Sequence, residues 1–170
     1  YLQYYTPQKD KVLQCNQMVA LLQIQKNLPA EVLKQAKELW TSGVVQKDCD
    51  PAFQYLQNKK LLNSELTWQR IVALMTKGQG KNAGELGKTL PKELQTWLGR
   101  WQQMLVNPAA QLKKVTYPHE PQACDILLHG IKQLSKKDAN AAYQFLKKAL
   151  EGHNCSETAK QEILRTIALA

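Results

Sequence analysis

The sequence predicts an all-α protein, built as an α-superhelix (solenoid) of stacked antiparallel helical hairpins. Apolar residues recur at the helical spacing i, i+3, i+4, i+7, for example over residues 15–22, 68–75 and 94–101. Ala, Leu, Gln and Lys dominate the composition, and these residues favour helix. Two hairpins of similar length, one early and one late, indicate a helical array rather than a closed bundle.

The periodic segments and their boundary signals predict the helices in order. We expect helices near 9–26, 29–42, 50–58, 64–77, 91–105, 108–114, 121–134, 138–150 and 156–170. Short loops join them, so sequential neighbours should pack antiparallel. Prolines stand where five of these helices begin, at Pro29, Pro51, Pro91, Pro108 and Pro121.

Small polar residues and glycines mark further helix ends. Asp50 and Asn107 precede prolines and are predicted N-caps. Gly43, Gly78 and Gly152 are predicted stops. Together these helices are expected to form a single domain over 1–170. Because the chain begins and ends inside helical patterns, we expect it to be a piece of a longer protein, with any signal peptide already removed.

The four cysteines are placed to clip two hairpins. Cys15 opens one helical pattern and Cys49 follows the end of the next, while Cys124 and Cys155 hold the equivalent positions in the late hairpin. In an antiparallel hairpin the start of the first helix lies beside the end of the second. This geometry selects Cys15–Cys49 and Cys124–Cys155 among the three possible pairings. Two disulfides indicate an oxidising compartment.

A zinc site is the alternative use of the late cysteines. Cys124, His129, His153 and Cys155 include the right ligand types, but a five-residue step within one helix turns His129 away from Cys124. We therefore expect no metal and no cofactor.

The chain carries a formal net charge of +9 and has a pI near 9.4. Solvated Lys-rich helix faces would produce this charge, and so would a surface for an anionic partner such as nucleic acid, anionic lipid or an acidic cell-wall polymer. The sequence has no Arg-rich tract or aromatic-basic RNA motif, and disulfides are rare in the cytosol, so no nucleic-acid partner is expected. No apolar run reaches about 18 residues, so no transmembrane segment is expected.

Other motifs are better explained by structure than by chemistry. Gly87-Lys88-Thr89 ends like a phosphate-binding loop, but Asn82 stands at the first glycine position and no strand precedes it. We interpret residues 78–89 as a flexible connector. Four tryptophans on apolar stripes are predicted core residues rather than sugar platforms: Trp40, Trp68, Trp97 and Trp101. His119 and His153 are expected in surface loops. No arrangement of residues typical of catalysis is present, so no catalytic residue is predicted.

Several of these residues carry a family resemblance. Cys15-Asn16, the run 36–40, Gly43 and Cys49-Asp50 with Phe53 resemble the superhelical, non-catalytic N-terminal region (U domain) of the soluble lytic murein transglycosylases. The resemblance continues more generically through Asn107-Pro108 and from Asp138-Ala139 to Ala142.

The resemblance implies a right-handed α-superhelix that forms much of a ring. In the parent enzyme, a lysozyme-like C-terminal domain would carry the catalytic glutamate. It would cleave the MurNAc–GlcNAc bond of peptidoglycan and leave a 1,6-anhydro sugar. The Glu-Ser dipeptide and the glycine-rich motifs of that domain are absent from this sequence. No catalytic residue can be carried over, and the fragment is expected to be inactive alone.

The sequence therefore predicts a periplasmic, non-catalytic domain that contacts the catalytic domain of the same protein and binds peptidoglycan strands weakly. The candidate contacts, which the sequence does not rank, are Lys34, Lys37, Lys59, Lys60, Lys113 and Lys114. The alternative is a tetratricopeptide-like scaffold for a protein partner, although a strict repeat of about 34 residues is not evident. A basic helical-repeat nucleic-acid binder is the third possibility.

Overall fold

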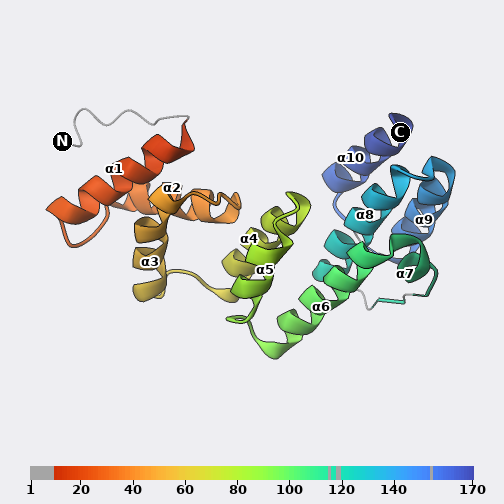
Figure 1. Ribbon diagram of the computed structural model, residues 1–170, viewed down its shortest axis with the longest axis horizontal. Helices are drawn as coiled ribbons and strands as arrows, with labels where there is room; N and C mark the ends of the chain where they lie inside the picture. Colours follow the sequence, from red (N-terminus) through yellow and green to blue (C-terminus); the bar gives the residue numbers. More distant parts are fainter. Residues whose placement is uncertain (1–9, 115, 118–119, 154) are drawn as a thin grey trace. The chain divides into compact units, whose positions relative to one another are not determined.

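The computed structural model describes residues 10–114, 116–117, 120–153 and 155–170, and it is helical along most of these ranges (Figure 1). No strand occurs within them. The predicted all-α class is therefore confirmed. The elements are α1 (Lys11–Ile24), α2 (Ala30–Thr41), the 3₁₀ helix η2 (Lys47–Cys49), α3 (Asp50–Asn58), α4 (Ser64–Thr76), α5 (Gly80–Gly87), α6 (Lys92–Val106), α7 (Pro108–Lys114), α8 (Pro121–Ser135), α9 (Ala139–Gly152) and α10 (Glu157–Ala168).

The helices gather into two compact units, Tyr1–Leu90 and Pro91–Ala170, called unit 1 and unit 2 below. In unit 1, α1 packs against α2, η2 and α3, α2 also packs against α3 and α4, and α4 packs against α5. In unit 2, α8 lies at the centre and contacts α6, α7, α9 and α10. Mostly neighbouring elements pack together, as expected for stacked hairpins.

Side-chain caps fix several helix starts. Asp10 accepts hydrogen bonds from the backbone N–H groups of Val12 and Leu13 at 2.8 and 3.0 Å. Asn107 accepts from the backbone of Ala110 at 3.1 Å and so acts as the predicted cap of α7. The prediction for Asp50 was wrong. Cys49 holds the N-cap position of α3, and Asp50 is already the first helical residue because η2 leads directly into α3.

Residues 80–87 form a helix, which corrects the predicted flexible connector. Three glycines lower the helix propensity of this segment. Packing against α4 overrides that preference, since Ala83 is fully buried and Gly87 is buried beside it. The turn before α5 follows another helix rather than a strand, so the phosphate-loop geometry is absent here.

Both disulfides join the pairs that the hairpin spacing selected. Cys15 near the start of α1 is bonded to Cys49 in η2, with the Cα atoms 4.8 Å apart. Cys124 near the start of α8 is bonded to Cys155, just beyond α9, with the Cα atoms 5.5 Å apart. Each bond therefore ties the beginning of one helix to the segment that follows its antiparallel neighbour.

The four tryptophans belong to the cores of the units, as predicted, because each is 7% exposed or less. Gly43 shows how closely two helices approach in unit 1. It has a φ of +64°, and a Cβ atom there would lie 2.8 Å from the Cβ atom of Ala73 on α4. Glycine alone combines an easy positive φ with the lack of a Cβ atom, which explains why it occupies the turn just after α2. Within the described residues, no helix is long and apolar enough to cross a membrane.

Candidate functional site

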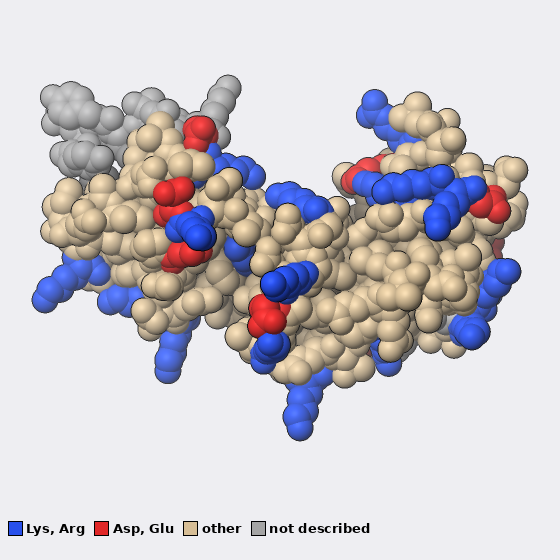
Figure 2. Space-filling model, in the orientation of Figure 1, with Lys and Arg blue, Asp and Glu red and all other residues tan. Residues whose placement is uncertain are grey.

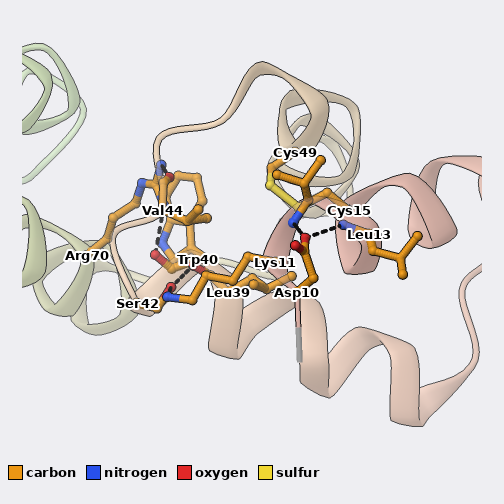
Figure 3. Close-up of a disulfide and its surroundings, with 11 residues drawn as sticks. Asp10, Lys11, Leu13, Cys15, Leu39, Trp40, Ser42, Val44, Cys49 and Arg70 are labelled. Atoms are coloured by element: carbon orange, nitrogen blue, oxygen red, sulfur yellow. Dashed lines mark hydrogen bonds between the residues drawn. A yellow bond between two sulfur atoms is a disulfide. The ribbon is translucent and has the colours of Figure 1, made fainter. Parts of the chain in front are cut away.

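Arg70 is a buried residue of α4 that links this helix to the end of α2 in unit 1. Its guanidinium donates hydrogen bonds to the carbonyl oxygens of Trp40 and Val44, at 2.8 and 2.9 Å (Figure 3). It also lies 4.4 Å from the ring centroid of Trp40 and 4.7 Å from that of Phe53. A single side chain on α4 therefore fixes the end of α2 and the loop that follows it.

The charge on Arg70 is retained despite its burial. The side chain is 9% exposed, and desolvation lowers its pKa to about 10, while the nearby Asp50 carboxylate partly offsets this effect. The guanidinium therefore remains protonated at neutral pH. The sequence does not single out Arg70, because its partners are backbone carbonyls and ring faces that lie far away in the sequence.

A groove of about 560 Å³ lies between α2 and α4, and we call it the basic groove. Its lining residues are Ala30, Leu33, Lys34, Lys37, Glu38, Thr41, Leu66 and Gln69. Leu33 and Leu66 are half-buried and provide apolar surface. Lys34 is exposed, Lys37 is half-buried, and neither forms an ion pair within the described residues. The groove thus combines apolar walls with two lysines that are available to an anion.

Two of the six candidate lysines, Lys34 and Lys37, line the basic groove, and the other four do not. Lys59 donates a hydrogen bond to the Oδ1 atom of Asn27 at 3.2 Å, and Lys60 occupies a left-handed turn with a φ of 54°. Lys113 and Lys114 lie on α7 in unit 2. Figure 2 shows Lys and Arg side chains spread over the visible face, with fewer Asp and Glu among them. Lys34 and Lys37 are therefore the best-placed pair.

A second depression, of about 680 Å³, lies on the side of Arg70 that faces α3 and α5. Its polar lining includes Gln46, Gln54, Gln57 and Asn82. Two cations, Lys47 and Arg70, are balanced there by two carboxylates, Asp50 and Glu85. This cleft has no net charge, so it does not contribute to attraction of an anionic polymer.

The possible zinc ligands in unit 2 are used in other ways. Cys124 and Cys155 form a disulfide, and the Nε2 atom of His153 lies 3.2 Å from the carbonyl oxygen of Tyr117. No cluster of three or more His, Cys, Asp or Glu suited to a metal is found in the described ranges. His119 lies outside the described residues.

His129 forms a buried pair with Trp101. It is 6% exposed, and its Nδ1 atom accepts a hydrogen bond from the indole N–H of Trp101 at 3.0 Å. The remaining ring proton of the neutral imidazole therefore lies on Nε2. The side-chain amide of Gln133 lies 3.1 Å from this atom, and it accepts the proton when its oxygen, rather than its nitrogen, is turned to the ring. Protonation of Nδ1 would place its N–H against the indole N–H of Trp101, so that two hydrogen-bond donors would face each other. Burial, with smaller contributions from Lys132 and Lys136, lowers the pKa of His129 from 6.5 to about 4.

Acid should therefore destabilise unit 2 through His129. The unfolded chain binds a proton near pH 6.5, but the folded chain does so only near pH 4, so stability is lost as the pH falls between these values. We expect about 3 kcal/mol less unfolding free energy at pH 4 than at pH 7 from this residue. Denaturant titrations of the native chain and of His129→Gln at both pH values measure this difference in unfolding free energy. An identical pH dependence in the two proteins would contradict this role of His129.

Comparison with known proteins gives structural matches and no sequence matches. No protein-family model matches the chain, and no curated protein matches it. An inactive mutant of the lytic transglycosylase Slt from Pseudomonas aeruginosa aligns with 99% of this chain, at a TM-score of 0.81 and 25% identity. The 70-kDa soluble lytic transglycosylase from Escherichia coli aligns with 94% at a TM-score of 0.66 and 20% identity, and a 70-kDa soluble lytic transglycosylase in complex with bulgecin A gives the same TM-score at 21% identity.

These matches are partial with respect to the larger proteins. The chain spans 27% of the length of the Pseudomonas Slt chain and 26% of each of the other two. Nearly the whole of this chain is thus accounted for by about a quarter of each relative. The chain resembles the soluble lytic transglycosylases, and its helical fold matches a segment of these enzymes.

Proposed function

We propose that this chain is a non-catalytic, superhelical part of a periplasmic soluble lytic transglycosylase. The parent enzyme would cleave the MurNAc–GlcNAc bond of peptidoglycan and release 1,6-anhydromuropeptides. The observation that carries the proposal is the match of 99% of this chain to 27% of a lytic transglycosylase chain, at a TM-score of 0.81. Such a match supports a structural segment of a larger enzyme rather than a complete enzyme.

The placement of the acidic residues supports a non-catalytic role. In the described part of the chain, every Asp and Glu is exposed except Asp125, which is half-buried. Cleavage of a glycosidic bond commonly needs a carboxylic acid whose pKa is raised by an apolar pocket, so that it can donate a proton near neutral pH. An exposed carboxyl group lacks that environment. The acid would instead come from another part of the parent enzyme.

The net charge supports a second role as a weak guide for the substrate. Peptidoglycan carries carboxylates on its stem peptides, and exposed lysines attract them over a Debye length of about 8 Å at physiological salt. One exposed ion pair contributes on the order of 0–1 kcal/mol. Useful affinity would therefore need several contacts along one strand, with Lys34 and Lys37 in the basic groove as two of them.

We expect the purified chain to sediment with insoluble murein at low salt and to be released as salt increases. Raising the salt from about 0.01 to about 1 M shortens the Debye length from about 30 to about 3 Å, which removes most of the attraction between exposed charges. Pull-down at a series of salt concentrations measures it, with uncharged chitin as the matched polymer. Absence of binding at low salt, or retention that is equal at all salts, would contradict the electrostatic role.

The same incubation tests the proposed lack of catalysis. Mass spectrometry of the supernatant should find no 1,6-anhydromuropeptides above the level of a mock purification. Release of these products by the chain would show that the fragment itself carries the lytic activity. Binding and cleavage are scored separately, so either part of the proposal can fail while the other stands.

A further inference from the structure

We propose that the basic groove between α2 and α4 binds the peptide portion of the polymer rather than its sugar chain. The ligand class is a short acidic peptide with small apolar side chains. This inference rests on the proposed function, because it names the part of peptidoglycan that the groove would contact. It also makes a distinct claim, since binding by scattered lysines elsewhere on the surface would satisfy the proposed function without it.

The groove has walls suited to small apolar side chains. Leu33 of α2 and Leu66 of α4 are half-buried, and Ala30 adds a methyl group at one end. Covering such surface stabilises a complex by about 25 cal/mol for each Å² that is removed from water. The volume of about 560 Å³ is within the range typical of small-ligand sites.

The groove is also held in a fixed shape before any ligand arrives. The indole N–H of Trp40 donates to the carbonyl oxygen of Leu66 at 3.2 Å, which ties α2 to the first turn of α4. The backbone N–H of Leu66 in turn donates to Oδ1 of Asn63 at 2.9 Å. Arg70, also on α4, donates a hydrogen bond to the carbonyl oxygen of Trp40 at 2.8 Å. Little reorganisation should therefore be needed for binding.

The charges in the groove favour a carboxylate. Lys34 and Lys37 lie three residues apart on α2, so they face the same side of the helix. Neither has an ion-pair partner in the part of the chain that the structure describes. Glu38 lies in the same lining and would oppose an anion, which leaves a net charge of one positive unit. Two lysines and one glutamate therefore predict a site that binds an anion weakly, and Glu38 lowers the affinity further.

A peptide fits this lining better than a sugar ring does. Sugar sites commonly offer an exposed aromatic face, whereas no aromatic residue lines the groove, and Trp40 beneath it is 3% exposed. The polar groups available besides the charges are those of Thr41 and Gln69. The Thr41 hydroxyl already donates to the carbonyl oxygens of α2. A peptide that alternates methyl groups with carboxylates would place apolar groups on the walls and anions beside the two lysines, which a sugar ring would not do.

The test is titration of the isotope-labelled chain with the N-acetylated peptide Ala-Glu-Ala-Glu, followed by amide NMR. We expect shift changes at Leu33, Lys34, Lys37 and Leu66 and millimolar affinity. The variant Lys34→Gln/Lys37→Gln should bind about tenfold more weakly, as expected when two exposed ion pairs are lost. Glu38→Gln should bind about twofold more tightly, because it removes the opposing carboxylate.

Matched controls separate the groove from general charge. Lys113→Gln/Lys114→Gln removes the same charge from exposed positions on α7 and should leave peptide affinity unchanged. The uncharged peptide Ala-Gln-Ala-Gln and a soluble N-acetylglucosamine oligomer should bind more weakly than the acidic peptide. Equal losses in the two lysine double variants, stronger binding of the sugar oligomer, or no shifts at the groove would overturn the proposal.

Murein sedimentation distinguishes failure of the groove assignment from failure of the proposed function. If murein binds but the acidic peptide does not, the groove assignment is wrong and the proposed function stands. If the peptide binds at the groove but murein does not, the site exists and the proposed murein role is wrong. If both bind, Lys34→Gln/Lys37→Gln should also reduce retention on murein, and unchanged retention would place the murein contacts elsewhere.

Discussion

Replacing Cys15 and Cys49 together by alanine is expected to lower the unfolding free energy of unit 1 by about 3–4 kcal/mol. The bond closes a loop with a sequence separation of 34 residues, and it limits the conformations of the unfolded chain. Both cysteines are fully buried, so the smaller alanine side chains also remove packing contacts. The bond ties α1 to η2 and hence to the start of α3. Its loss should therefore affect unit 1 first.

Hydrogen exchange resolved by residue measures this effect, because it reports the two units separately. Amides of α1, α2 and α3 should lose protection in Cys15→Ala/Cys49→Ala, while those of α8 and α9 keep theirs. Cys124→Ala/Cys155→Ala is the matched control and should show the reverse pattern. If Cys15→Ala/Cys49→Ala lost protection in unit 2 instead of unit 1, or in neither unit, the predicted stabilisation of unit 1 by the Cys15–Cys49 bond would be contradicted. Non-reducing peptide mapping of the native protein checks the pairing independently.

The sequence predicted the helices wherever packing follows a simple period. The stripes at 15–22, 68–75 and 94–101 fall within α1, α4 and α6, and the four tryptophans on apolar stripes are buried. The disulfide pairs followed from the same regularity. Predicted helix ends differ by a residue or two at α1 and α9, whereas the predicted helix 50–58 coincides with α3. Only the N-cap role of Asp50 was wrong, because the short 3₁₀ turn before α3 leaves no distinct signal in the sequence.

The sequence did not predict features that depend on contacts between distant segments. The glycines of residues 80–87 indicate a loop locally, yet burial of Ala83 against α4 makes the segment helical. Arg70 and His129 look like ordinary polar helix residues until their partners, 26 to 30 positions away, are known. Six lysines were equivalent candidates in the sequence. Only the packing of α2 on α4 singles out Lys34 and Lys37.

The second large effect is expected from Arg70→Met, which should destabilise unit 1 by about 3 kcal/mol. Methionine fills a similar volume but donates no hydrogen bond. The carbonyl oxygens of Trp40 and Val44 would then lose their charged donor, and an unpaired buried acceptor costs about 1–3 kcal/mol. The stacking of the guanidinium on Trp40 and Phe53 is lost as well. Denaturant unfolding, with exchange at α2 and α4 as the local reporter, measures the change.

Arg100→Met is the matched control, because Arg100 has the stacking without the hydrogen bonds. Its guanidinium lies 4.5 Å from the ring centroid of Trp97, and the structure shows no hydrogen bond from it within the described residues. Its replacement should cost less than about 1 kcal/mol. Equal effects of the two variants would show that stacking, not carbonyl pairing, carries the stability. Arg70→Lys should recover only part of the loss, because an ammonium group lacks the planar fork that reaches two carbonyls and stacks on a ring.

Arg70→Met should also weaken binding of the acidic peptide to the basic groove, although Arg70 does not line that groove. Arg70 holds the carbonyl oxygen of Trp40, and the indole of Trp40 holds Leu66, so the lining of the groove depends on Arg70 through two hydrogen bonds. A groove that is no longer fixed must be ordered by its ligand, which lowers affinity. Full peptide affinity in a folded Arg70→Met protein would show that the groove keeps its shape without this support. A parallel loss of stability and affinity would show that the residue that stabilises unit 1 also shapes the groove.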